Sequence, residues 1–302
     1  MKVVIGVDGS HASIDAMAQA CRLLSPARDS LTLCYSPPDI RSAISFEYHL
    51  MERGQIKLSE SILDHAMLHV PKEWNSRSVR VVGPGEPANG ILKAAEELAA
   101  DLIVIGTRGL GGLGRLLIGS VSRKIVHRAN IPVLVVRKRP RAEETAGMRI
   151  LLACESNETG RELSKVLERF AWPSGSVGEV IHVVTNVFGG AIPDWLDAEA
   201  RKPEVDQLVN LWVQHHDERL AAARKEMTAL GSELPLCFRS APPIVVEGTP
   251  DVEILKVAQR QESDLIVIGA KTSTPFGRLM AGSTCESVLN HAPCSVLVVR
   301  HP

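Results

Sequence analysis

An internal repeat limits the folds open to this chain more than any other feature of its sequence. The hexapeptide DLIVIG occurs at residues 101–106 and again at residues 264–269, 163 positions later. At the same offset, GEPANGILKAAEELAADLIVIG aligns without gaps with GTPDVEILKVAQRQESDLIVIG, and VLVVR at 133–137 aligns with VLVVR at 296–300. Agreement of this length at a constant offset indicates a duplication, so we expect the same fold twice.

The two copies differ in length. VVIGVDGS at 3–10 resembles ILLACESN at 150–157 at the shorter offset of 147, so the second copy carries about 16 additional residues, which fall within 186–243. The polar run KRPRAEETAG at 138–147 separates the copies and is typical of an interdomain linker. A chain of 302 residues is also about two domains long. We therefore predict domains at 1–140 and 147–302.

Each copy alternates apolar runs with segments of helical period. In the first copy the expected strands are Val3–Val7, Leu31–Tyr35, Val79–Val82, Leu102–Ile105 and Val133–Val136, and the expected helices are 12–24, 47–69, 88–99 and 120–129. Nearly continuous apolar strands joined by helices predict a parallel sheet covered on both faces. The expected fold class is α/β, with two tandem doubly wound domains that each contain a five-stranded parallel sheet.

Charge and hydropathy exclude several classes of partner. Lys and Arg number 34 against 35 Asp and Glu, so the formal net charge of −1 provides no basic field to attract nucleic acid or an anionic membrane. The start, MKVVIGVDGS, lacks the apolar run of a secretory signal, and no apolar run of membrane-spanning length follows. We expect a cytoplasmic protein.

Motifs for catalysis and metal binding are weak. His65 and His69 lie four residues apart on an expected helix, but no third ligand accompanies them, so a surface helix face accounts for them. The six cysteines form no CxxC pair and are expected to be reduced. Neither copy has a GxSxG elbow, a HExxH helix or a cysteine with an identifiable base. We assign no catalytic residue.

The glycine-rich stretch GTRGLGGLGRLLIGS at 106–120 is the strongest candidate for a binding site. It is not a P-loop, because the chain contains no Gly-Lys-Ser or Gly-Lys-Thr. A GxGxxG match at 109–114 follows the fourth strand instead of the first and lacks the acidic residue about 20 positions further on. A third spacing remains, Gly106-x2-Gly109-x9-Gly119-Ser120, with the first glycine ending a strand and the last pair opening a helix.

That spacing suits a polyphosphate. Gly106 and Gly109 lack a Cβ, so the backbone can turn tightly and bring its N–H groups against a bulky anion. Ser120 is expected to be the N-cap of the following helix, whose free N–H groups near Val121 favour phosphate oxygens. The alternative, that the glycines only let the loop pack over the sheet, stays open.

The same spacing resembles the fingerprint of the universal stress protein family. The resemblance extends to VDGS at 7–10, DLIVI at 101–105 and PVLVV at 132–136, and it covers most of both halves. It implies the strand order 3-2-1-4-5, in which the first and fourth strands lie side by side where the winding reverses. Ligands bind at that point of open parallel sheets, so Asp8 and Gly106 are expected at one crevice.

The resemblance also implies a ligand and a role. The ligand is ATP, with Mg²⁺, and the role is that of a nucleotide-linked regulator of stress or dormancy. The residues carried over by position, with two arginines added for their charge, are Asp8, Ile105, Gly106, Arg108, Gly109, Arg115, Gly119, Ser120 and Val121. An adenylate-forming enzyme, a slow ATPase and a nucleotide-free interaction module remain as alternatives.

The second copy departs from this pattern. Thr272 stands at the position of Gly109, Pro275 removes an N–H from the loop, and Glu155 replaces Asp8. We therefore expect one strong ATP site per chain, in the first half. The edge strands Val133–Val136 and Val296–Val299 are expected to pair within one polypeptide as a pseudo-dimer, and a homodimer is left open.

Overall fold

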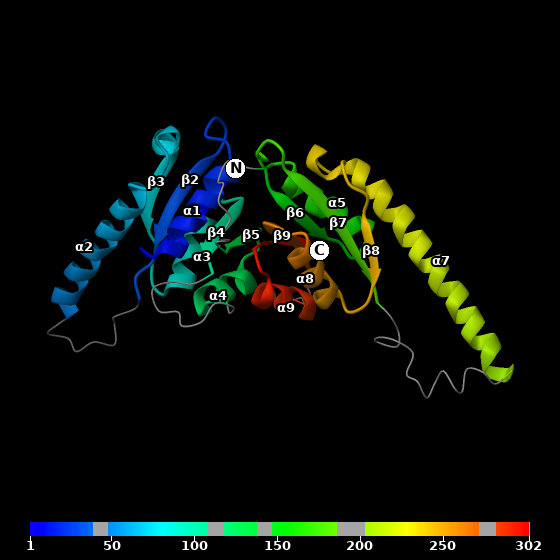
Figure 1. The fold of residues 1–302 in the computed structure, drawn as a ribbon. Helices are drawn as coiled ribbons and strands as arrows, with labels where there is room; N and C mark the ends of the chain where they lie inside the picture. Colours follow the sequence, from blue (N-terminus) through cyan, green and yellow to red (C-terminus); the bar gives the residue numbers. More distant parts are fainter. Residues whose placement is uncertain (39–47, 108–117, 138–146, 186–202, 272–281, 302) are drawn as a thin grey trace.

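The strands of both halves belong to one sheet in the computed structural model, which describes residues 1–38, 48–107, 118–137, 147–185, 203–271 and 282–301. The strands are β1 Lys2–Gly6, β2 Ser30–Tyr35, β3 Ser78–Val82, β4 Leu102–Gly106, β5 Val133–Val136, β6 Arg149–Ala153, β7 Val177–Val184, β8 Ile244–Glu247, β9 Leu265–Lys271 and β10 Ser295–His301. The ten strands follow the order β3-β2-β1-β4-β5-β10-β9-β6-β7-β8 (Figure 1).

Each half has the predicted strand order. The first half reads β3-β2-β1-β4-β5, and the second half reads β8-β7-β6-β9-β10 from the other edge, so both follow 3-2-1-4-5. All neighbouring strands within a half are parallel. The fold class expected from the repeat, two doubly wound α/β units, is confirmed.

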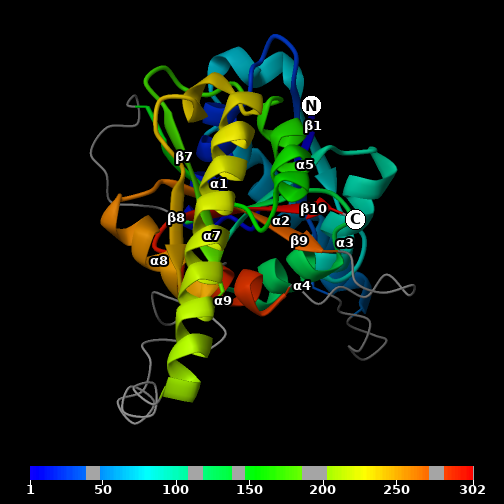
Figure 2. The same ribbon diagram turned by 90° about the vertical axis from the view of Figure 1, so that its right-hand side faces the viewer.

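Helices cover both faces of the sheet (Figures 1 and 2). They are α1 His11–Leu23, α2 Tyr48–Met67, α3 Pro87–Glu97, α4 Ser120–Arg128, α5 Asn157–Leu167, α7 Pro203–Glu233, α8 Pro250–Arg260 and α9 Ser283–His291, with short 3-10 helices η1 Lys72–Arg77 and η2 Leu236–Phe238. Buried residues of α1, α2, α5 and α7 form one core with the sheet, and those of α3, α4, α8 and α9 form the other. None of the described helices is long and apolar enough to cross a membrane.

The halves join through β5 and β10, the one antiparallel pair of the sheet as described. Val135 lies opposite Val296, and Leu134 lies opposite Leu297. The strands that we expected to pair within the chain therefore do so. Each core also contains side chains from both halves, with Leu134 and Leu297 in the same cluster.

Arginines at the ends of β5 and β10 hold the opposite half. Arg137 donates from Nη2 to the carbonyl of Leu289, 2.7 Å away, and from Nη1 to the carbonyl of Ala292, 2.9 Å away, at the C-terminal end of α9. Arg300, 163 positions after Arg137, donates from Nη2 to the carbonyl of Val126 on α4. Val126 is itself 163 positions before Leu289, so the two contacts occupy equivalent positions in the two copies.

Helices α4 and α9 meet beside this seam. Arg123 donates to Oδ1 of Asn290 at 2.8 Å, and His127 Nε2 contacts the carboxylate of Glu286. At the offset of 163, Arg123 corresponds to Glu286 and His127 to Asn290, so these two contacts occupy equivalent positions with different residues. The seam therefore keeps the symmetry of the duplication while its side chains have diverged.

Candidate functional site: a crevice in each half

The first crevice lies where β1 and β4 run side by side. The strands pair in parallel, with Val3 opposite Leu102 and Ile5 opposite Val104. Asp8 follows β1 closely, and Gly106 is the last residue of β4, so both belong to the carboxyl ends of adjacent strands at the reversal of winding. Asp8 and Gly106 therefore belong to the same edge of the sheet, as their positions after the first and fourth expected strands predict.

Asp8 is held in place by the start of α1. Its Oδ1 accepts hydrogen bonds from the backbone N–H of Ser10 at 3.0 Å and from the Ser10 hydroxyl at 2.6 Å. Ser10 in turn caps α1, its Oγ accepting from the N–H of Ser13 at 3.3 Å. Gly9, between them, adopts φ +79°, which glycine tolerates without strain. The carboxylate is thus fixed at the crevice.

Tyr35 ends β2 beside Asp8 and was missed by the sequence argument. Burial raises the pKa of its phenol, and the nearby Asp8 carboxylate raises it further. The hydroxyl therefore remains a neutral hydrogen-bond donor at neutral pH. The sequence signal for Tyr35 is its position at the end of the second expected strand, which lies next to the first strand in the expected order.

Gly106 has a packing role that the sequence could not reveal. A Cβ built on Gly106 would lie 2.7 Å from the carbonyl oxygen of Ala12 and 2.9 Å from its carbon, so the backbone of α1 occupies this space. Ile105, the preceding residue, is buried in the core next to Gly6. Close packing alone accounts for a glycine at position 106.

The N-terminus of α4 is tied to the end of β4. Gly119 donates its N–H to the carbonyl of Thr107 at 2.7 Å, and the Ser122 hydroxyl donates to the carbonyl of Gly106 at the same distance. The N-cap is Gly119, with Ser120 as the first helical residue, so the expected cap at Ser120 is wrong by one position. The reason is that the hydrogen bond from the Gly119 N–H to the Thr107 carbonyl holds Gly119 at the start of α4, just before the first helical residue.

First-turn amides of an α-helix have no partner within the helix, and here they begin at the crevice. Ser120 is exposed and Val121 is half-buried. Arg108, Gly109 and Arg115 lie outside the described residues.

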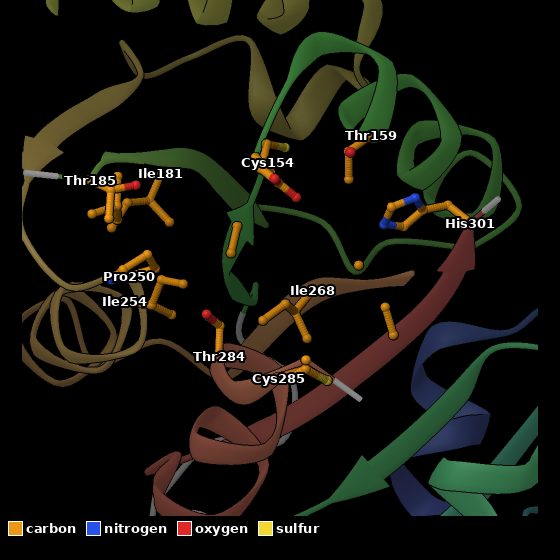
Figure 3. A pocket seen from close by; sticks show the side chains of 16 residues that line it. Cys154, Thr159, Ile181, Thr185, Pro250, Ile254, Ile268, Thr284, Cys285 and His301 are labelled. Carbon is orange, nitrogen blue, oxygen red and sulfur yellow. The ribbon is translucent and has the colours of Figure 1, made fainter. Parts of the chain in front are cut away.

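The second crevice contains a cavity of about 420 Å³ (Figure 3). It lies at the corresponding place, between the ends of β6 and β9 and the start of α9. Its lining consists of Ala153, Cys154, Glu155, Thr159, Ile181, Val183, Thr185, Pro250, Ile254, Ile268, Gly269, Ala270, Gly282, Thr284, Cys285 and His301. The sequence of this half indicates the loss of phosphate contacts but contains no local signal for the cavity.

His301 is the residue that most distinguishes this crevice. A Cβ built on Gly269 would lie 2.9 Å from both Cδ2 and Nε2 of His301 and 3.1 Å from Cγ2 of Thr159. The imidazole is buried and, as Figure 3 shows, points toward Thr159. Gly269 is the counterpart of Gly106, so a side chain from β10 now covers the glycine that ends the fourth strand of this half.

The thiols of this crevice are neutral. Burial raises the pKa of Cys154 and that of Cys285 to about 12. A thiol with such a pKa carries no charge at neutral pH and is a poor nucleophile. All six cysteines of the chain are free in the structure.

Comparison with known proteins agrees with the fold and the duplication. The model of the universal stress protein family matches residues 1–137 and again 149–300. A universal stress protein of Methanocaldococcus jannaschii is 35% identical over 145 residues, which cover 45% of this chain and 82% of that protein. A universal stress protein of Mycolicibacterium smegmatis is 24% identical over an alignment of 314 positions, which covers 99% of this chain and 96% of that protein.

A solved structure has the same architecture over the whole chain. The crystal structure of a universal stress protein from Archaeoglobus fulgidus superimposes with a TM-score of 0.60 at 18% identity, covering 100% of this chain and 98% of that one. At this identity the likeness concerns the fold alone. Together with the double match of the family model, it leads to one conclusion: the chain belongs to the universal stress protein family and carries the family's domain twice.

Proposed function

We propose that the first half, residues 1–140, binds ATP with Mg²⁺ and that the chain acts as a nucleotide-linked regulator of the stress response in the cytoplasm. The second half, residues 147–302, lacks a strong ATP site in this proposal. The two halves work as an intrachain pseudo-dimer joined at β5 and β10. Two copies of the whole chain can in turn form a homodimer. The proposed ATP contacts are Asp8, Ile105, Gly106, Arg108, Gly109, Arg115, Gly119, Ser120 and Val121.

One observation carries this proposal: the N-terminus of α4 is fastened to the end of β4 at the reversal of winding. The hydrogen bonds Gly119 to Thr107 and Ser122 to Gly106 fix where the first-turn amides of α4 begin. Such amides, with the positive end of the helix dipole, bind phosphate oxygens. The residues present therefore suit the triphosphate.

The other side of the crevice suits the nucleoside part. The Asp8 carboxylate, fixed by Ser10, can accept from ribose hydroxyls, and the neutral Tyr35 hydroxyl lies close to it. Mg²⁺ in proteins is commonly bound by substrate phosphates and water, so here it would be held mainly through the triphosphate. Bound ATP–Mg²⁺ would bring the charged triphosphate and the metal ion into the crevice. The residues of this chain would bind and orient them.

A matched pair of variants tests the ATP site. Gly119 and Gly282 are the N-caps of α4 and α9, with nearly equal extended backbones of φ −66°, ψ 156° and φ −54°, ψ 157°. Either position accepts valine without backbone strain. We expect isothermal titration of the intact chain to give one ATP site, which Gly119→Val abolishes and Gly282→Val leaves unchanged.

Other results would point elsewhere. Two equivalent tight sites, or loss of binding only in Gly282→Val, would place the ATP site differently. Turnover of ATP to AMP and pyrophosphate would favour an adenylate-forming enzyme. No nucleotide binding by the unmodified protein would favour an interaction module.

A further inference from the structure

We infer that two copies of this chain associate through the free edge of β3, pairing their β3 strands antiparallel so that the sheet continues from one copy into the other. This inference rests on the proposed function only in taking up the homodimer named there, and it needs no nucleotide. The directions of the backbone groups of β3, its exposed valines and the different character of the other edge carry it.

The backbone of β3 has one bonded side and one outward side. Among the described strands, β3 is the outermost at one end of the sheet and pairs with β2 (Figure 1). Tyr35 of β2 lies opposite Val82, and its carbonyl accepts from the Gly83 N–H at 2.7 Å. Because successive residues of a strand direct their N–H and C=O groups to alternate sides, those of Ser78, Arg80 and Val82 point away from β2.

This set of outward groups is complementary to an identical set. In an antiparallel pair centred on a twofold axis at Arg80, Arg80 lies opposite Arg80 of the second copy, and Ser78 lies opposite Val82 of the second copy. Each opposed pair of this kind exchanges two hydrogen bonds, which gives about six in all. A contact of one surface with itself closes after two copies, so it produces a dimer and not a filament.

The side chains of β3 leave apolar surface for a second copy to cover. Val79 is 54% exposed and Val82 is 49% exposed. Val81 lies on the same face of the strand as Val79 and packs against the core. In the pair centred on Arg80, Val79 lies opposite Val81 of the second copy, at a position where opposed side chains are close. Pairing would therefore cover Val79 with another valine.

The charges at the centre of the pair are balanced within each copy. Nη1 of Arg80 contacts Oδ1 of Asp64 on α2, and both side chains are at least half exposed. Two Arg80 side chains would meet on one face of the extended sheet, each beside its own Asp64. Two cations then lie next to two anions, which offsets the repulsion between opposed like charges.

The other edge of the sheet differs at the corresponding positions. The Gly248 N–H donates to the Val184 carbonyl at 3.2 Å, so the outward groups of the β8 edge include those of Val245 and of Pro243, just before the strand. Proline has no N–H and is a common device for blocking an edge strand. Pro243 stands where β3 has Ser78, relative to the neighbouring strand. The difference favours pairing of β3 with β3 over pairing of β3 with β8.

Two variants at Arg80 test this edge. Arg80→Pro removes the outward N–H at the centre of the pair and leaves the N–H groups that bond to β2 in place. Arg80→Ala removes the same side chain and its contact with Asp64 but keeps the N–H. In sedimentation equilibrium up to about 1 mM, we expect the unmodified chain and Arg80→Ala to form dimers alike, and Arg80→Pro to have a dissociation constant at least about tenfold higher.

Further variants locate the interface independently of proline. Val79→Lys places a charge opposite Val81 of the second copy and should weaken the dimer as much, while the exposed position tolerates lysine in the single chain. Val245→Pro removes an outward N–H from the other edge and should leave the dimer intact. In hydrogen exchange followed by NMR, the amides of Arg80 and Val82 should become protected as the dimer forms, whereas that of Val81 is protected throughout.

The outcomes separate this inference from the proposed function. A chain that stays monomeric up to about 1 mM, or that forms open polymers, overturns the inference. A dimer that survives both Arg80→Pro and Val79→Lys in folded proteins, or that is lost only in Val245→Pro, also overturns it. Titration with ATP tests the proposed function on its own: if the unmodified chain binds no ATP but forms the β3 dimer, the ATP site fails and the inference stands.

Discussion

Gly106 and Gly269 show how one residue type at equivalent positions performs different tasks. In the first half the space beside the glycine is filled by the backbone of Ala12, at 2.7 Å from an added Cβ. In the second half it is filled by the imidazole of His301 and the methyl group of Thr159. A backbone cannot move without shifting α1, whereas the ring of a side chain can rotate or yield.

We therefore expect Gly106→Ala to destabilise the protein more than Gly269→Ala. Overpacking against rigid neighbours costs about 1–3 kcal/mol, and the Ala12 backbone is the more rigid neighbour. The measurement is the free energy of unfolding in urea for both variants without nucleotide. An equal or larger loss in Gly269→Ala would show that His301 is as firmly held as the α1 backbone.

The sequence could predict which residues share the first crevice but not what each touches. Asp8 and Gly106 follow apolar runs that had to be neighbouring strands, and β1 and β4 are indeed paired. The contact of Gly106 with Ala12 joins residues far apart in the chain and depends on how α1 packs. The position of His301 depends on β10 pairing with β9 as far as Lys271, which no local pattern indicates.

At the scale of the elements, periodicity predicted most strands and helices of the first half. The run Leu31–Tyr35 became β2, Ser30–Tyr35, and the segment 88–99 became α3, Pro87–Glu97. These elements follow from continuous apolar strands and from a 3.6-residue apolar period, both of which are local properties. Their ends moved by one or two residues because caps and final hydrogen bonds decide them.

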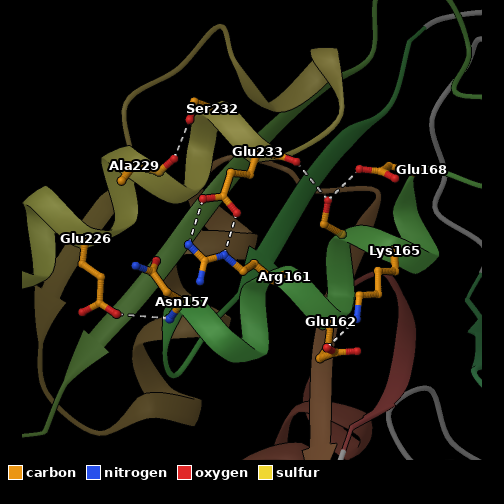
Figure 4. Close-up of polar contacts among 10 residues, drawn as sticks. Asn157, Arg161, Glu162, Lys165, Glu168, Glu226, Ala229, Ser232 and Glu233 are labelled. Carbon is orange, nitrogen blue, oxygen red and sulfur yellow. Dashed lines mark hydrogen bonds and ion pairs between the residues drawn. The ribbon is translucent and has the colours of Figure 1, made fainter.

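The long helix α7 shows what local patterns leave open. It lies within the stretch of additional residues located by the change of offset and has 31 residues against 20 for α2. Its attachment depends on Gly160 of α5, where an added Cβ would lie 2.3 Å from Leu230. Arg161 donates to both oxygens of Glu233 beside this contact, at 2.6 and 2.9 Å (Figure 4). The packing of α7 against α5 depends on these tertiary contacts, which local sequence patterns do not indicate.

Arg137 and Arg300, the arginines at the ends of β5 and β10, differ in how many hydrogen bonds they make to the opposite half. We therefore expect their removal to cost different amounts of stability. Arg137 makes two hydrogen bonds to the end of α9, whereas Arg300 has a buried Nη1 with no partner among the described residues, and burial lowers the pKa of its guanidinium. Arg137→Met should cost about 2 kcal/mol of unfolding free energy, because charge-assisted bonds to two carbonyls are lost.

Arg300→Met should cost less, because it also removes an incompletely satisfied buried charge. Thermal and urea unfolding of both variants provide the measurement. A larger loss for Arg300→Met would mean that its single bond to the Val126 carbonyl outweighs the pair made by Arg137.

At the scale of the whole molecule, the two family domains are not separate bodies. Their sheets are continuous through β5 and β10, and each hydrophobic core draws side chains from both halves. Leu134 and Leu297, opposite each other on the seam, are both 0% exposed. Unfolding one half alone would expose these side chains and the unpaired edge of the other half, so the halves should stabilise each other.

We therefore expect the halves to unfold together. In native-state hydrogen exchange, the slowest amides of β1 and of β6, the central strands of the two halves, should report the same free energy of opening, because both open only by global unfolding. Leu134→Asp, which places a charge in the buried seam, should weaken the coupling so that the two free energies diverge. Different free energies for β1 and β6 in the unmodified protein would mean that each half is a separate cooperative unit and that the continuous sheet does not couple them.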